Sequence, residues 1–107
     1  MRKILDVFIA KGLNDGQSRK DATRGHWAKI SDATADSIGF VRGRTLWGSD
    51  YHVTAYEVTG WSRDSSGRIE FEVADFEDQA VLRCMYDMPV ASPAGARAWR
   101  ISGDVDD

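Results

Sequence analysis

The segment that most constrains the fold is residues 51–76, which reads as two β-strands joined by a short turn. In its second half, RIEFEVAD, the apolar residues Ile69, Phe71 and Val73 alternate with glutamates. Strict alternation places the apolar side chains on one face of a strand and the acidic side chains on the other. This strand therefore has a core side and an acidic side that faces solvent.

The first half of the segment, YHVTAYEVTGW, changes its apolar phase along the strand. Val53 and Ala55 fall in one phase, whereas Tyr56 and Val58 fall in the other. A β-bulge near residues 55–56, or burial on both faces, accounts for such a change.

Charge decides between the possible registers of this hairpin. A six-residue turn would set Glu57 opposite Glu72, and like charges directly opposite each other destabilise a ladder. A four-residue turn over residues 64–67 avoids that pair and suits a type I turn with Gly67 in the left-handed conformation. We therefore predict the shorter turn.

The shorter turn pairs Val58 with Val73 and places Trp61 beside Glu70 on the acidic face. Phe71 then lies across from Gly60 and covers it. An aromatic side chain surrounded by charged residues is typical of a protein–protein hot spot. The predicted partner-binding residues are Trp61, Glu57, Thr59, Glu70 and Glu72.

The remaining segments predict short elements of both kinds. Residues 2–10 fit either a helix or a strand, and we favour a strand because Arg2 and Lys3 oppose a helix dipole. Residues 14–25 are polar and contain glycine, which indicates a long exposed loop. Ser31 can cap a short helix. Further strands are expected at residues 26–30, 40–47 and 97–101, and a longer helix is expected to follow a cap at Asp75 and to end at Pro89.

Together these elements predict an α+β fold. We expect an antiparallel β-meander of about five strands, with one helix near residues 76–88 and a short helix near residues 32–38. The length of 107 residues indicates a single domain over residues 1–102, followed by a frayed acidic tail at residues 103–107.

Composition narrows the class of protein. The net charge of −3 combines +3 over residues 1–50 with −6 over residues 51–107. No apolar run approaches the length of about 20 residues that spans a bilayer, and the first residues lack the order of a signal peptide. The single cysteine, Cys84, excludes an intramolecular disulfide and is expected to be buried. We expect a soluble, cytoplasmic protein that does not associate with membranes and requires no cofactor; the sequence leaves a homo-oligomer open.

Catalytic and metal-binding patterns are weak. The histidines are His26 and His52, and the closest constellation, Ser49-Asp50-Tyr51-His52, lacks the glycines of a nucleophile elbow. No HxH, HExxH or paired-cysteine spacing indicates a metal site. A small hydrolase-like enzyme that uses His52 and Asp50 stays an alternative.

Nucleic-acid binding is a second alternative. Basic residues in the first half of the chain are interleaved with aromatic residues, a mixture that can neutralise phosphates and stack bases. The predicted nucleic-acid-binding residues are Arg19, Lys20, Arg24, Trp27, Arg42 and Arg44. A pI near 5.3 argues against a dedicated nucleic-acid binder.

The function we favour from the sequence is a non-catalytic protein–protein interaction module with a basic protein partner. Its small size, its acidity and the lack of catalytic motifs fit a stand-alone inhibitor. A phage or mobile element could encode such an inhibitor against a host protein that handles nucleic acids.

Overall fold

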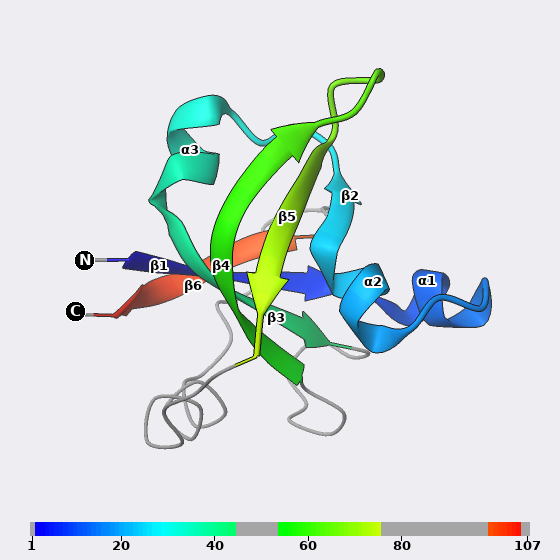
Figure 1. The fold of residues 1–107 in the computed structure, drawn as a ribbon. Coiled ribbons are helices and arrows are strands. Elements are labelled where there is room, and N and C mark those ends of the chain that lie inside the picture. Colours follow the sequence, from blue (N-terminus) through cyan, green and yellow to red (C-terminus); the bar gives the residue numbers. More distant parts are fainter. Residues whose placement is uncertain (1, 45–53, 76–98, 106–107) are drawn as a thin grey trace.

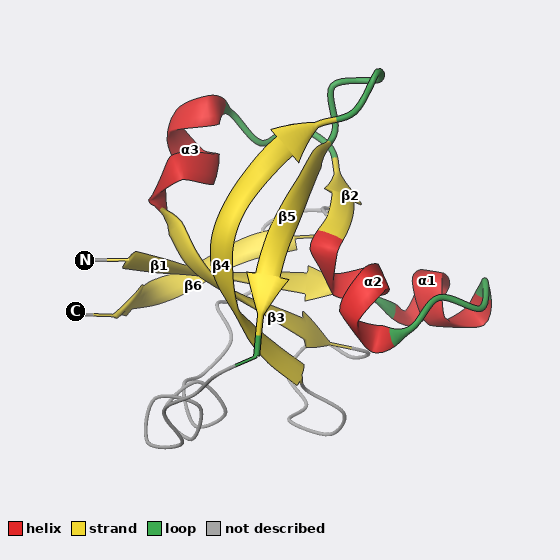
Figure 2. Cartoon of the chain, viewed as in Figure 1, coloured by secondary structure: helices red, strands yellow, loops and turns green. Residues whose placement is uncertain are grey.

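The computed structural model describes residues 2–44, 54–75 and 99–105, which form one mixed β-sheet with three short helices at its margins (Figure 2). The strands are β1 (Arg2–Phe8), β2 (Gly25–Trp27), β3 (Ile38–Arg44), β4 (Thr54–Arg63), β5 (Ile69–Ala74) and β6 (Trp99–Val105). The helices are α1 (Ala10–Asn14), α2 (Arg19–Arg24) and α3 (Asp32–Ser37). The predicted α+β class is confirmed.

The strand order β2-β5-β4-β3-β1-β6 differs from a simple meander. β3, β4 and β5 follow one another as antiparallel neighbours, as predicted. β1, however, pairs in parallel with β3 and antiparallel with β6. A parallel pair needs a long crossover connection, and here the chain passes through all three helices and β2 between the two strands.

The sheet curls, so that β4 and β5 lie in front of β1 and β6 (Figure 1). The indole N–H of Trp99, at the start of β6, donates to the carbonyl oxygen of Ala28, just after β2, at 2.8 Å. This bond joins the two edges of the sheet. The curl encloses one core, whose fully buried members include Leu5, Val41 and Phe71. Burying each such side chain contributes about 1.5–3 kcal/mol.

Two local predictions in the first half of the chain are confirmed. Residues 2–8 form a strand. α3 begins after Ser31, whose side chain accepts a hydrogen bond from the backbone N–H of Thr34 at 3.2 Å. This bond satisfies one of the amide groups left open at a helix start.

The predicted loop at residues 14–25 is wrong over its second half, because α2 lies there. Ser18 caps this helix by accepting from the backbone N–H of Asp21 at 3.1 Å. Ala22 and Thr23 are its buried residues. A helix of six residues with so few buried side chains shows no apolar periodicity in the sequence, which explains the error.

Two boundaries also differ from the prediction. β2 covers three residues rather than the expected 26–30. β6 continues to Val105, through residues expected to belong to a frayed tail. The expected helix near residues 76–88, with Cys84, lies outside the described residues. Among the helices that the structure describes, none is long and apolar enough to cross a membrane.

Candidate functional site

The β4–β5 hairpin carries the predicted partner-binding residues, and its register differs from the prediction by one residue near the turn. Val58 lies opposite Val73, as predicted. Beyond this pair the register shifts, and Trp61 lies opposite Phe71. Thr59 is the extra residue of the β-bulge that produces the shift.

The prediction that Trp61 shares a face with Glu70 and Glu72 is therefore wrong. Residues directly opposite each other in an antiparallel pair point to the same face, and Phe71 is fully buried. Trp61 is partly buried and packs against the same core. The bulge is favourable because it moves a large indole from the acidic face toward the core, a gain on the order of 1–3 kcal/mol.

Two carboxylates of the predicted acidic face, Glu57 and Glu70, are paired within the protein. Glu57 Oε1 lies 3.3 Å from Arg2 Nη1. Glu70 Oε1 lies 3.4 Å from Arg24 Nη2, and its Oε2 lies 3.1 Å from His26 Nε2. These partners offset much of the negative charge. A role in partner binding stays a prediction for Glu57, Thr59, Glu70 and Glu72.

Trp61 instead forms a wall of a hollow between α3 and β4, with a volume of about 320 Å³. Its indole N–H donates to Asp36 Oδ1 at 2.8 Å, and Asp36 is exposed. The guanidinium carbon of Arg63 lies 5.7 Å from the centre of the Trp61 ring. We name this site the Trp61 hollow; its lining residues are Ala35, Asp36, Ile38, Val58, Thr59, Gly60 and Trp61.

Local structure fixes the geometry of the Trp61 hollow. The Ser31 cap starts α3 and thereby sets Asp36 on the last turn of that helix, facing β4. The Glu72 carboxylate lies on the other face of the hairpin, where a Cβ atom at Gly60 would lie 2.9 Å from its Oε2. The hollow therefore combines apolar walls with the Asp36 carboxylate at its edge.

Three of the six predicted nucleic-acid-binding residues are buried, and the other three keep exposed surface. Arg42 and Arg44 have no exposed surface. Arg24 donates from Nε to the carbonyl oxygen of Phe71 at 3.0 Å. Trp27 is buried, and its indole N–H donates to the Thr23 carbonyl at 3.0 Å. Arg19 is partly buried, with Nε 2.6 Å from Thr54 Oγ1, whereas Lys20 is exposed. Binding of nucleic acid by these residues stays a prediction.

Arg42 and Arg44 belong to a buried ionic cluster centred on Asp6. Arg42 donates from Nε and Nη2 to the two carboxylate oxygens of Asp6, each at 2.7 Å. Arg44 Nε donates to Asp6 Oδ1 at 3.1 Å, and the Ser102 hydroxyl donates to Oδ2. The pairing of Asp6 with Arg42 in the β1–β3 register brings these groups together. A two-pronged contact of this kind holds a guanidinium in one orientation.

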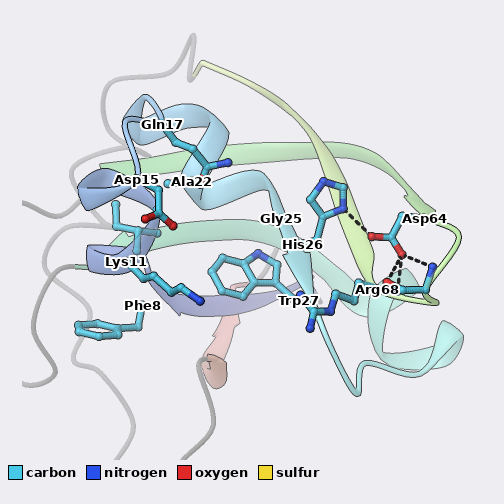
Figure 3. Close-up of a pocket in the computed structure, with 13 residues that line it drawn as sticks. Phe8, Lys11, Asp15, Gln17, Ala22, Gly25, His26, Trp27, Asp64 and Arg68 are labelled. Atoms are coloured by element: carbon cyan, nitrogen blue, oxygen red, sulfur yellow. Dashed lines mark hydrogen bonds and ion pairs between the residues drawn. The ribbon is translucent and has the colours of Figure 1, made fainter.

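A larger groove lies between α1, β2 and the β4–β5 turn (Figure 3). Its volume is about 620 Å³. Phe8, Ile9 and Trp27 supply apolar walls, and Lys11 and Arg68 are exposed charged residues of the lining. We refer to this site as the groove.

His26 stands at the edge of the groove between two carboxylates. Its Nδ1 lies 3.0 Å from Asp64 Oδ2, and its Nε2 lies 3.1 Å from Glu70 Oε2 (Figure 3 shows the Asp64 contact). A neutral imidazole has one N–H, so both contacts are hydrogen bonds only in the protonated ring. Neither ring nitrogen is left to activate a nucleophile.

Asp64 is ionised over the whole ordinary pH range. The Ser66 hydroxyl donates to Asp64 Oδ1 at 2.7 Å, and the backbone N–H groups of Ser66 and Arg68 donate to the same oxygen. These bonds, chiefly that from the Ser66 hydroxyl and with help from nearby His26, lower the pKa of Asp64 from 3.8 to about 2.

The sequence reasoning missed the contact of Trp61 with Asp36 and the whole groove. Trp61 and Asp36 are 25 residues apart, and only the packing of α3 on the sheet brings them together. A signal for Asp64 was present, since an aspartate that opens a turn commonly accepts hydrogen bonds from the amides that follow. The alternative catalytic residues His52 and Asp50 lie outside the described residues.

Among the residues that the structure describes, no group of three or more His, Cys, Asp or Glu side chains is arranged to hold a metal ion. Comparisons with protein-family models, with curated proteins and with solved structures gave no match to the chain. The chemistry of the sites is therefore what points to a function.

Proposed function

We propose that the protein is a non-catalytic protein–protein interaction module that takes a basic side chain of its partner at the Trp61 hollow. One observation carries the proposal: the partly buried indole of Trp61 faces a hollow and donates to the exposed carboxylate of Asp36 at 2.8 Å. Aromatic anchors in small apolar depressions, with charge at the edge, are typical of interaction hot spots.

The chemistry of the occupant follows from the groups that surround the indole. An aromatic face attracts a cation, and a neighbouring carboxylate adds a charge-assisted hydrogen bond. Arg63 illustrates this chemistry within the protein: its guanidinium lies 5.7 Å from the Trp61 ring centre, and its Nη2 lies 2.6 Å from Asp32 Oδ1. A partner arginine or lysine can approach Asp36 from the side of the hollow in the same manner.

The partner that best fits an acidic module is a protein that handles nucleic acids, because such proteins present basic surfaces to phosphates. The net charge of −3 favours the encounter with such a surface. In this proposal the module acts as a small inhibitor that occupies part of the basic surface.

A hydrolytic function is less well supported by the described residues. Ser66 donates its hydroxyl proton to Asp64 rather than to a histidine. His26 faces carboxylates at both ring nitrogens. A serine nucleophile needs a base that accepts its proton, and this arrangement gives Ser66 only a carboxylate of pKa about 2.

The proposal is tested by capturing a partner from the organism that encodes the chain and then measuring its affinity for purified variants. Asp36→Asn keeps the shape of the side chain and removes its charge, and we expect it to weaken binding about 10-fold. Trp61→Phe should weaken binding by a similar factor because it removes the indole N–H and part of the aromatic surface.

The matched control is Asp75→Asn, since Asp75 is an exposed aspartate that does not line the Trp61 hollow. It should bind the partner as the wild type does. If Asp36→Asn and Asp75→Asn bind the captured partner equally well, the Trp61 hollow is not the contact site.

A further inference from the structure

The groove is a second site, separate from the Trp61 hollow. It is lined by α1, the end of β1, β2 and the β4–β5 turn, whereas the Trp61 hollow is lined by α3 and β4. Its volume of about 620 Å³ lies within the range of pockets that hold small organic ligands. Its apolar walls and charged edge suit a small ligand that has an apolar part and a charged group.

Some charged groups of the groove are held by hydrogen bonds and ion pairs within the protein, and others are not. Asp64 is held by Ser66, by two backbone amides and by His26. Lys11 and Arg68, in contrast, are exposed, and their side chains form no ion pair that the structure shows among the described residues. Figure 3 shows both side chains running toward the Trp27 indole from opposite sides. Two cations thus remain available to a ligand.

Apolar and aromatic residues supply the wall of the groove beside these cations. Trp27 is 9% exposed and adds this small part of its surface to the wall, and Phe8 is partly exposed. Trp27 is held in place because its N–H donates to the carbonyl oxygen of Thr23 at 3.0 Å. A fixed wall of apolar and aromatic side chains suits a planar ring system, because one face of the ring can be buried against it.

We propose that the groove binds a nucleotide unit, with the planar base along the apolar wall of Phe8, Ile9 and Trp27 and the phosphate held by Lys11 and Arg68. The unit can be a free nucleotide or one residue of a single-stranded nucleic acid, because both offer a base joined to a phosphate. Asp15, an exposed carboxylate on the same edge, opposes the phosphate and limits the affinity. This proposal does not depend on the Trp61 hollow.

The test uses the full chain and four probes at about 50 mM salt: adenosine, adenosine monophosphate, and octameric single-stranded DNA and RNA. Binding is followed by the amide chemical shifts of the groove residues. We expect the phosphate-bearing probes to bind more tightly than adenosine. Lys11→Glu and Arg68→Glu should each weaken their binding about 10-fold. Asp15→Asn should strengthen it.

Lys29→Glu is the matched control, since Lys29 is exposed, follows β2 and does not line the groove. This variant should bind the probes as the wild type does. Octamers that bind at least about 10-fold more tightly than the mononucleotide identify a nucleic acid as the source, whereas equal affinities identify a free nucleotide.

Two results would overturn the proposal. One is the absence of binding by all phosphate-bearing probes up to about 1 mM. The other is binding that Lys11→Glu and Arg68→Glu leave unchanged, or that Asp15→Asn weakens, because a cationic or uncharged ligand would then fit the groove better.

Discussion

Replacing Asp6 by asparagine removes the central charge of the buried ionic cluster while keeping the size of the side chain. Asp6, Arg42 and Arg44 have no exposed surface. The carboxylate accepts two hydrogen bonds from Arg42 at 2.7 Å and one from Arg44 at 3.1 Å. The asparagine side chain has one uncharged oxygen acceptor, so at least one guanidinium donor loses its acceptor and both arginines lose the Asp6 charge.

The expected cost of Asp6→Asn is about 3–5 kcal/mol, the range observed when one partner of a buried ion pair is removed. The total stability of a domain of this size is about 5–15 kcal/mol, so the loss is a large fraction of it. With a urea m-value of about 1–3 kcal/mol/M, the midpoint of unfolding should fall by roughly 2 M.

Urea unfolding followed by tryptophan fluorescence and by circular dichroism measures this shift. Asp75→Asn is the control, because Asp75 is exposed and its replacement should change stability by less than about 0.5 kcal/mol. An Asp6→Asn loss below about 1 kcal/mol would refute the reasoning. The buried ionic cluster would then contribute little to the stability of the fold.

Three further predictions concern the turn and the backbone. The pKa of Asp64, about 2, lies below its ordinary value of 3.8, so its contribution to stability is present above pH 3.8 and is lost as the pH falls toward 2. Ser66→Ala should raise this pKa, which a titration of the Asp64 carboxyl carbon by NMR measures. Gly67 has φ +84°, and its replacement by alanine should lower the free energy of unfolding by about 1–2 kcal/mol, which urea unfolding measures. Lys29 has φ +66°, and its replacement by glycine should raise the free energy of unfolding by about 0.5–1 kcal/mol. A higher urea midpoint would show this gain.

The elements that the sequence predicts correctly are those set by local chemistry. Alternating side chains identify the β5 strand, and Gly67 adopts the left-handed conformation predicted for the turn. The cap at Ser31 identifies the start of α3. Each of these features depends on residues within a few positions of one another, which is why a single sequence contains the information.

The errors concern pairings between distant segments. Alternation shows that Arg42 and Arg44 share a face of β3, but it does not show that this face is buried beside Asp6, 36 residues earlier than Arg42. The parallel pairing of β1 with β3 has no local signature either.

The position of Trp61 shows the same limit more sharply. Charge alone favours the regular register, which leaves the indole on the acidic face. The bulge at Thr59 changes the balance because the gain from packing Trp61 near Phe71 exceeds the cost of one disrupted ladder position. That gain depends on α3 and the core, which are not visible within the hairpin. The site in the structure therefore has the predicted aromatic residue, Trp61, but its acidic neighbour is Asp36 and not the predicted Glu70.

The most direct test of the Trp61 hollow is the map of amide and indole N–H chemical shifts when the captured partner is titrated into isotope-labelled protein. The indole N–H signal that is missing from the spectrum of Trp61→Phe is assigned to Trp61. We expect the largest changes at the Trp61 indole N–H and at the amides of Asp36 and Gly60. Changes confined to the outer face of β4 and β5, at Glu57 and Glu72, with an unperturbed Trp61 indole, would contradict the proposed site.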